Sequence, residues 1–147
     1  MNLTFVGGGN MAAALIGGLL GKGHAAASIR VVELQAAARA RLAAQFGVNC
    51  VDSVTAAVPL GEVVVLAVKP QQMRAAAAAL SPRLAHELVI TIAAGIRLVD
   101  LSRWLGGYAA LVRCMPNTPA LIGIGISGLY ASAAVGAEQR ALARVDA

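Results

Sequence analysis

Short apolar runs alternate with alanine-rich stretches along most of the chain. The apolar runs are rich in Val, Ile and Leu and are bounded by Gly, Pro, Ser or charged residues, which is typical of β-strands. The two most continuous runs, Glu62–Val68 and Glu87–Ile92, have the composition of strands buried on both faces of a parallel sheet. The predicted strands are Asn2–Val6, Ser28–Val32, Val48–Val51, Glu62–Val68, Glu87–Ile92, Ala109–Cys114 and, as a last edge strand, Gly123–Tyr130.

The stretches between these strands have apolar residues at helical spacing. Gly21 and Gly23 end the first stretch, Gly47 has the position of a C-cap, and Pro70 stands where a first helical turn favours proline. The predicted helices are Asn10–Leu20, Leu34–Phe46, a short one near Ser53–Val58, Gln71–Leu80 and Leu98–Leu105. This alternation predicts an α/β fold of the Rossmann type, with a doubly wound, mainly parallel sheet and right-handed crossovers.

The length bounds the domain organisation. The 147 residues are enough for one domain with a substantial core. We predict a Rossmann dinucleotide-binding domain over residues 1–131. Residues 132–147 include the Ala137–Ala147 stretch, which has helical spacing, and are predicted to begin a helical connection that leads out of this domain.

Composition narrows the classes of partner. Hydrophobic residues make up 59% of the chain and charged residues 13%, so the chain has ample apolar surface for a folded core. The formal net charge is +5, but Lys and Arg are scattered and only 3% of residues are aromatic, which argues against nucleic-acid binding. Cys50 and Cys114 stand far apart and outside any Cys/His cluster, so no metal site is predicted.

The uncharged N-terminal stretch differs from a signal peptide and from a membrane helix. No Lys or Arg precedes its apolar residues, and the glycines that begin at Gly7 interrupt the apolar run early. We therefore expect a cytoplasmic protein that has no association with a membrane.

A glycine-rich loop, Val6-Gly7-Gly8-Gly9-Asn10-Met11-Ala12, connects the first predicted strand to the first predicted helix. Its Gly-x-Gly-x-x-Ala spacing, in a strand–turn–helix context, is typical of dinucleotide binding. Gly7 is expected to make the tight turn, Gly9 to let the backbone approach a pyrophosphate, and Ala12 to let the helix pack closely on the strand. The helix N-terminus would attract the phosphates. The competing interpretation is a glycine-rich turn that binds no ligand.

Glu33 closes the second predicted strand, at the position where an acidic residue hydrogen-bonds the adenosine ribose hydroxyls in NAD sites. Its negative charge would oppose the 2′-phosphate of NADP, so we predict NADH or NADPH as the cofactor, with a preference for NADH. Arg39 and Arg41 remain within reach of a 2′-phosphate, which keeps NADPH open. The competing interpretation of Glu33 is an ordinary solvated carboxylate at a strand end.

Three further strand ends are predicted to meet this loop, because ligands of open α/β sheets bind at the carboxyl ends of the strands. Lys69 and Pro70 follow one buried strand, although a lone lysine there also fits an ordinary surface residue. Ala93-Ala94-Gly95 follows the next strand with residues too small to obstruct a ligand. Met115–Pro119 follows the one after. Together these ends predict a cleft.

Taken together, these motifs resemble pyrroline-5-carboxylate reductase, the last enzyme of proline biosynthesis. Four stretches have this resemblance: Val6-Gly7-Gly8-Gly9-Asn10-Met11-Ala12, Leu66-Ala67-Val68-Lys69-Pro70-Gln71, Ala93-Ala94-Gly95-Ile96 and Val112-Arg113-Cys114-Met115-Pro116-Asn117-Thr118-Pro119. The first stretch is shared with many dehydrogenases, whereas the second and the fourth are far more specific. The resemblance covers essentially the whole chain.

The resemblance implies hydride transfer from NADH or NADPH to the ring C=N bond of 1-pyrroline-5-carboxylate, giving L-proline. Such a site needs little general acid–base machinery, because it mainly holds two reactants face to face. No catalytic residue is therefore assigned. Met115, Pro116, Asn117 and Thr118 would lie beside the nicotinamide and the substrate. Cofactor binding is carried over to Val6, Gly7, Gly8, Gly9, Asn10, Met11, Ala12, Glu33, Ala67, Val68, Lys69, Pro70, Ala93, Ala94 and Gly95.

Members of the resembled family continue with a helical C-terminal domain that dimerises, carries a Ser-Gly-Ser-Gly-Pro-Ala stretch and grips the substrate carboxylate. That domain is absent from these 147 residues. We therefore expect this chain to bind cofactor and, alone, to reduce little or no substrate, and the full-length family member to be a homo-oligomer. Two other interpretations stay open: an oxidoreductase like the β-hydroxyacid dehydrogenases, which would need a catalytic lysine on a second domain, and a non-catalytic dinucleotide-binding module.

Overall fold

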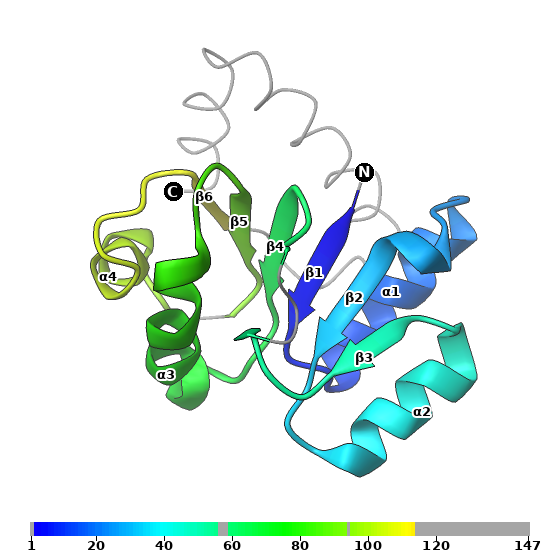
Figure 1. Ribbon diagram of the computed structural model, residues 1–147. Helices are drawn as coiled ribbons and strands as arrows, with labels where there is room; N and C mark the ends of the chain where they lie inside the picture. The colour runs from blue at the N-terminus through cyan, green and yellow to red at the C-terminus, as the bar shows by residue number, and fades with distance from the viewer. Residues whose placement is uncertain (1, 56–58, 94, 114–147) are drawn as a thin grey trace.

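The computed structural model describes residues 2–55, 59–93 and 95–113, and Figure 1 shows the arrangement of their helices and strands. The strands are β1 (Leu3–Val6), β2 (Ile29–Val32), β3 (Asn49–Val51), β4 (Val63–Leu66), β5 (Leu88–Thr91) and β6 (Leu111–Arg113). The helices are α1 (Asn10–Gly21), α2 (Ala36–Phe46), α3 (Pro70–Leu80) and α4 (Leu98–Trp104), with short 3-10 helices η1 (Ala26–Ser28) and η3 (Ser81–Arg83).

The strands form one six-stranded sheet in the order β3-β2-β1-β4-β5-β6. Every neighbouring pair is parallel. The chain winds outward in one direction from β1 and then in the other from β4, so the strand order reverses between these two neighbours. This is the doubly wound arrangement of Rossmann folds, and the predicted fold class is confirmed.

Helices cover both faces of the sheet, and alternate strand residues point to opposite faces. Val63 and Val65 of β4 pack with side chains of α1 and α2, whereas Val64 and Leu66 pack with side chains of α3 and α4. Figure 1 shows the two helix pairs on opposite sides of the sheet. All four of these β4 residues are fully buried, which explains the continuous apolar run in the sequence.

Several predicted boundaries differ from the observed ones at the carboxyl ends of strands. The strand predicted to run to Val68 ends at Leu66, because the Ala67 N–H makes a last bond to the Val6 carbonyl (2.8 Å) and the chain then turns. The helix predicted from Leu34 begins at Ala36, because a turn precedes it.

Other predicted elements lie partly or wholly outside the described residues. Of the short helix predicted near Ser53–Val58, residues 56–58 lie outside them; in the described part, Ser53 and Val54 form a bend and a turn, and Thr55 has 3-10 helical conformation. The predicted strand Gly123–Tyr130 and the stretch Ala137–Ala147 lie outside them altogether, so the domain boundary at residue 131 stays a prediction.

Candidate cofactor site

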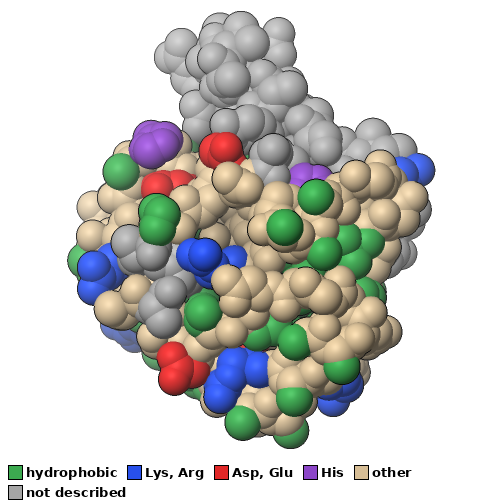
Figure 2. Space-filling view, turned by 45° about the vertical axis from the view of Figure 1, so that its right-hand side comes forward, with side chains coloured by type: hydrophobic (Ala, Val, Ile, Leu, Met, Phe, Trp, Pro, Cys, Tyr) green, Lys and Arg blue, Asp and Glu red, His purple; other side chains and the backbone are tan. Residues whose placement is uncertain are grey.

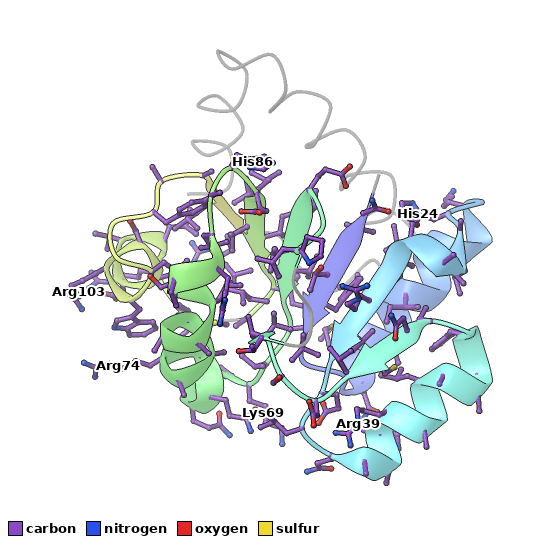
Figure 3. The ribbon with its side chains drawn as sticks, in the orientation of Figure 1. His24, Arg39, Lys69, Arg74, His86 and Arg103 are labelled. Carbon is purple, nitrogen blue, oxygen red and sulfur yellow. The ribbon has the colours of Figure 1, made fainter. Side chains whose placement is uncertain are left out.

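The carboxyl ends of the parallel strands bring most of the predicted site residues to one edge of the sheet. Gly7 follows β1, Glu33 follows β2, Ala67 follows β4 and Ile92 follows β5. Figure 3 shows Lys69 and Arg39 at this edge and His24 and His86 at the opposite end. The predicted convergence is therefore present, at the point where the strand order reverses and where open α/β sheets bind ligands.

Gly7 makes the turn out of β1 and needs to be glycine for two reasons. Its φ is +106°, a left-handed backbone conformation that other residues rarely adopt. A Cβ placed there would also lie 2.8 Å from the Ala67 carbonyl carbon. Its N–H donates to the Val32 carbonyl (2.8 Å), which ties the loop to β2. The loop is thus wedged between the ends of β2 and β4.

The N-terminus of α1 is open and suits an anion. A Cβ at Gly9, the N-cap, would meet nothing within 4 Å. Among the described residues, no side chain caps this helix end, and its first turn contains no acidic residue. The first-turn N–H groups of any α-helix lack intrahelical partners, and here Asn10 and Met11 are exposed while Ala12 is fully buried against the sheet. Phosphate groups fit such an end by charge and by hydrogen bonding.

The Glu33 carboxylate lies beside this loop and accepts bonds from two backbone amides. The Gly8 N–H donates to Oε1 (2.9 Å) and the Gln35 N–H donates to Oε2 (2.8 Å). An ionised carboxylate offers about four acceptor positions, so about half of them are left for a ligand. This geometry fits an acceptor for ribose hydroxyls, because the acid is partly exposed at the same edge as the loop.

Sequence reasoning assigned Gly8 to the cofactor site but missed its contact with Glu33. Gly8 is buried, and a Cβ on it would lie 2.8 Å from Leu42 Cδ1 and 3.1 Å from Glu33 Cβ. The only signal in the sequence is that Gly8 stands between two other glycines; its partners are Glu33, directly after β2, and Leu42 of α2.

Arg39 holds the backbone that carries Glu33. Its Nη1 donates to the carbonyl oxygens of Glu33 (2.8 Å) and Leu34 (3.0 Å). This guanidinium atom is therefore engaged by the protein backbone.

The half-buried Cys50 thiol of β3 is affected by both charged side chains. Burial raises the pKa of Cys50, the positive charge of Arg39 opposes that rise, and the negative charge of Glu33 adds to it.

The other half of the edge is formed by β4 and β5 and is lined by small residues. Ala67 and Val68 are half-buried, Ala93 is buried, and Gly95 turns the chain with a φ of +79°. Lys69 is exposed and is the N-cap of α3; it is extended, as a residue before proline usually is. Ala94 and Met115–Thr118 lie outside the described residues, so their predicted roles stay predictions.

Two large apolar side chains are exposed close in sequence to the glycine loop and to Glu33. Leu34, directly after Glu33, is 78% exposed, and Met11 in the first turn of α1 is 41% exposed. On the face seen in Figure 2, Lys and Arg side chains form separate groups with other side chains between them. An organic ligand with both polar and apolar parts would bury Leu34 and Met11, whereas a simple anion would leave them exposed.

Other classes of site find less support in the part of the chain that the structure describes. No group of three or more His, Cys, Asp or Glu is placed to hold a metal ion there. No described helix is long and apolar enough to cross a membrane. A cavity of about 300 Å³ lies near Asn2, Arg30 and Gly61, at the amino ends of the strands and away from the glycine loop.

Residues 2–95 match the family described as NADP oxidoreductase coenzyme F420-dependent. The chain belongs to this family. The matching segment runs from the start of β1 to Gly95, so it contains the glycine loop, Glu33, Lys69 and Ala93. The site residues that the structure brings together thus fall within the part of the chain that defines this oxidoreductase family.

Individual relatives confirm the resemblance predicted from the motifs. A pyrroline-5-carboxylate reductase from Pseudomonas aeruginosa is 51% identical over 138 residues, which cover 93% of this chain and 50% of the relative. A solved pyrroline-5-carboxylate reductase from Coxiella burnetii is 35% identical, with a TM-score of 0.74, covering 82% of this chain and 46% of the other.

A second solved structure shares the fold. Pyrroline carboxylate reductase from Plasmodium falciparum, solved with NADP bound, is 24% identical with a TM-score of 0.70, covering 83% of this chain and 44% of the other. The chain spans about half the length of the curated relatives it matches. These relatives do not favour the alternative of a β-hydroxyacid dehydrogenase-like enzyme.

Proposed function

We propose that this chain is the cofactor-binding half of an NAD(P)H-dependent pyrroline-5-carboxylate reductase, which reduces 1-pyrroline-5-carboxylate to L-proline. The observation that carries the proposal is the meeting of the open α1 N-terminus with the Glu33 carboxylate at one sheet edge. This edge belongs to a chain that is 51% identical over 138 residues to a pyrroline-5-carboxylate reductase.

The adenosine half of the cofactor fits the glycine loop and the end of β2. Gly9 leaves space for a pyrophosphate above the N-terminus of α1, and the remaining acceptor positions of Glu33 would hold the ribose hydroxyls. Leu34 and Met11, both exposed, would cover the apolar face of the adenine. Burial of these two side chains would add to the binding free energy.

The nicotinamide half fits the ends of β4 and β5. Ala67–Pro70 and Ala93–Gly95 would line it, and Met115–Thr118 would lie beside the substrate. When bound, reduced nicotinamide supplies a hydride for the C=N bond. Lys69 is the only charged residue in these three segments, and it is exposed at the N-cap of α3. We infer that these residues orient the reactants and exclude water.

The same geometry supports a preference for NADH over NADPH. The Glu33 carboxylate would accept a bond from the ribose 2′-hydroxyl but would repel a 2′-phosphate. Arg39, the first basic residue after Glu33 in the chain, donates from Nη1 to two backbone carbonyls. The Plasmodium falciparum relative was solved with NADP bound, so the fold also accommodates a dinucleotide that has a 2′-phosphate.

The full-length protein is further proposed to be a cytoplasmic homo-oligomer, with its substrate-carboxylate ligands outside these 147 residues. This follows from the family resemblance and from the half-length match to the curated relatives. Size-exclusion chromatography with light scattering on the full-length protein tests the oligomeric state.

The decisive experiment measures binding and turnover separately. Calorimetric titration of the 147-residue chain should give a dissociation constant for NADH about tenfold lower than for NADPH, the size expected for one bond to a charged group. Turnover is followed as loss of NADH absorbance with pyrroline-5-carboxylate, in this chain and in its fusion to the C-terminal half of the Pseudomonas aeruginosa reductase. A fusion that folds and binds NADH but leaves the imine unreduced would refute the proposed activity.

A further inference from the structure

Backbone amides from two separate segments set the position of the Glu33 carboxylate. The Gly8 amide comes from the loop after β1, and the Gln35 amide comes from the turn before α2. One oxygen atom is bound by each. The carboxylate is therefore positioned by the conformation of the glycine loop as well as by its own rotamer.

The contact between the loop and Glu33 leaves no room for a side chain at position 8. A methyl group on Gly8 would lie 2.8 Å from Leu42 Cδ1, and 3.1 Å and 3.2 Å from Glu33 Cβ and Cγ. Leu42 is fully buried in the core between α2 and the sheet, so it has little freedom to move away. Displacement of Glu33, which is only half-buried, is the easier response.

The backbone beneath the carboxylate is held from the other side. Arg39 Nη1 bonds the Glu33 and Leu34 carbonyl oxygens, and the Glu33 N–H donates to the Val51 carbonyl (2.9 Å). With the main chain fixed in this way, the side-chain contact with Gly8 decides where the two carboxylate oxygens lie.

We propose that Gly8 is a positioning residue for cofactor selectivity, because its amide and its lack of a side chain hold the Glu33 carboxylate where it meets the ribose 2′ position. The inference rests on the proposed dinucleotide function. It adds that the phosphate-binding loop and the ribose-binding end of β2 form one preformed unit. A change in the loop would then alter discrimination at the ribose, in addition to any effect on phosphate binding.

The test compares Gly8→Ala with Gly17→Ala in the 147-residue chain. Gly17 lies on α1, and a methyl group there would make an ordinary contact, 3.6 Å from the Phe46 ring. The measured quantity is the ratio of the dissociation constants for NADPH and NADH. Gly8→Ala should lower this ratio by about tenfold, since a displaced Glu33 neither bonds the 2′-hydroxyl nor repels a 2′-phosphate. Gly17→Ala should leave it unchanged.

A double-mutant cycle distinguishes positioning from simple damage to the loop. If Gly8 acts through Glu33, Gly8→Ala should leave the ratio unchanged in a Glu33→Gln background, where the charge is already absent. Equal weakening of both dinucleotides by Gly8→Ala, or a full additional effect on the ratio in that background, would overturn the inference. Circular dichroism melting of each variant confirms that it is folded.

A measurement without cofactor keeps the inference testable by itself. In the free chain, Glu33→Ala should shift the amide proton resonance of Gly8, which lies 25 residues away in sequence. An unshifted Gly8 resonance would overturn the inference. A wild-type chain that binds neither dinucleotide, but shows this shift, would instead overturn the proposed function and leave the structural link supported.

Discussion

Two glycine amides at opposite ends of the sheet donate to polar side chains, and their surroundings differ. At the carboxyl end, the Gly8 N–H bonds the part-buried Glu33 carboxylate. At the amino end, the Gly61 N–H bonds the Thr4 hydroxyl (3.0 Å), where Thr4 is only 1% exposed. Neither glycine has room for a Cβ: at Gly61 it would lie 2.6 Å from the Asn2 carbonyl carbon.

The acceptors account for the difference in role. A buried threonine hydroxyl that serves one amide stabilises the fold, because an unsatisfied buried N–H is costly. A half-exposed carboxylate that serves two amides keeps acceptor positions for a ligand. The same local contact therefore supports the core at one end of the sheet and the cofactor site at the other. Substitutions at the amino end should change stability and leave selectivity unaffected.

The largest effect is expected from Gly61→Ala. The new methyl group would overlap the Asn2 carbonyl, and the main chain of β1 is held between β2 and β4, so strain of about 3 kcal/mol is expected. Urea denaturation measures the loss of unfolding free energy. Gly21→Ala, where a methyl group meets nothing within 4 Å, is the matched control. A changed NADPH-to-NADH ratio in folded Gly61→Ala would contradict the separation of the two ends.

A smaller effect is expected from Thr4→Val, which keeps the shape of the side chain and removes the acceptor. The buried Gly61 N–H would lose its partner, at a cost of about 2 kcal/mol. Thr4→Ser retains the hydroxyl and should be the more stable of the two variants in urea denaturation. If the valine variant proved as stable as wild type, the amino-end bond would contribute nothing measurable.

The glycine loop was predictable because its spacing is local: Gly7, Gly9 and Ala12 act within one strand–turn–helix unit. The strands were predictable because residues such as Val63–Leu66 are apolar on both faces. Their parallel order follows from the alternation with helices and the handedness of crossovers.

The contacts between elements were not predictable in this way. The Gly8–Glu33 bond depends on the register of β1 against β2, and the lack of room at Gly8 depends on Leu42 of α2. The apolar side chain of Leu34 fits a helical pattern, which predicts a helix that begins there. In the structure, the Gln35 amide bonds the Glu33 carboxylate, and α2 begins only at Ala36.

The smallest effect should come from Tyr108, whose hydroxyl donates to the Glu87 carbonyl at the amino end of β5. Burial, with a further contribution from the Glu87 charge, raises the pKa of Tyr108 to about 12. Between pH 10 and 12 the unfolded chain loses this proton and the folded chain keeps it, so stability falls as the pH rises through this range. Because the phenol is partly exposed, we expect the unfolding free energy to fall by about 1 kcal/mol over this range.

Tyr108→Phe should be less stable than wild type at neutral pH, and this difference in stability should narrow above pH ~10 in thermal melts. If the stabilities of the two proteins fell in parallel as the pH rose, the prediction would be contradicted, because the hydroxyl would then favour neither protonation state in the folded chain.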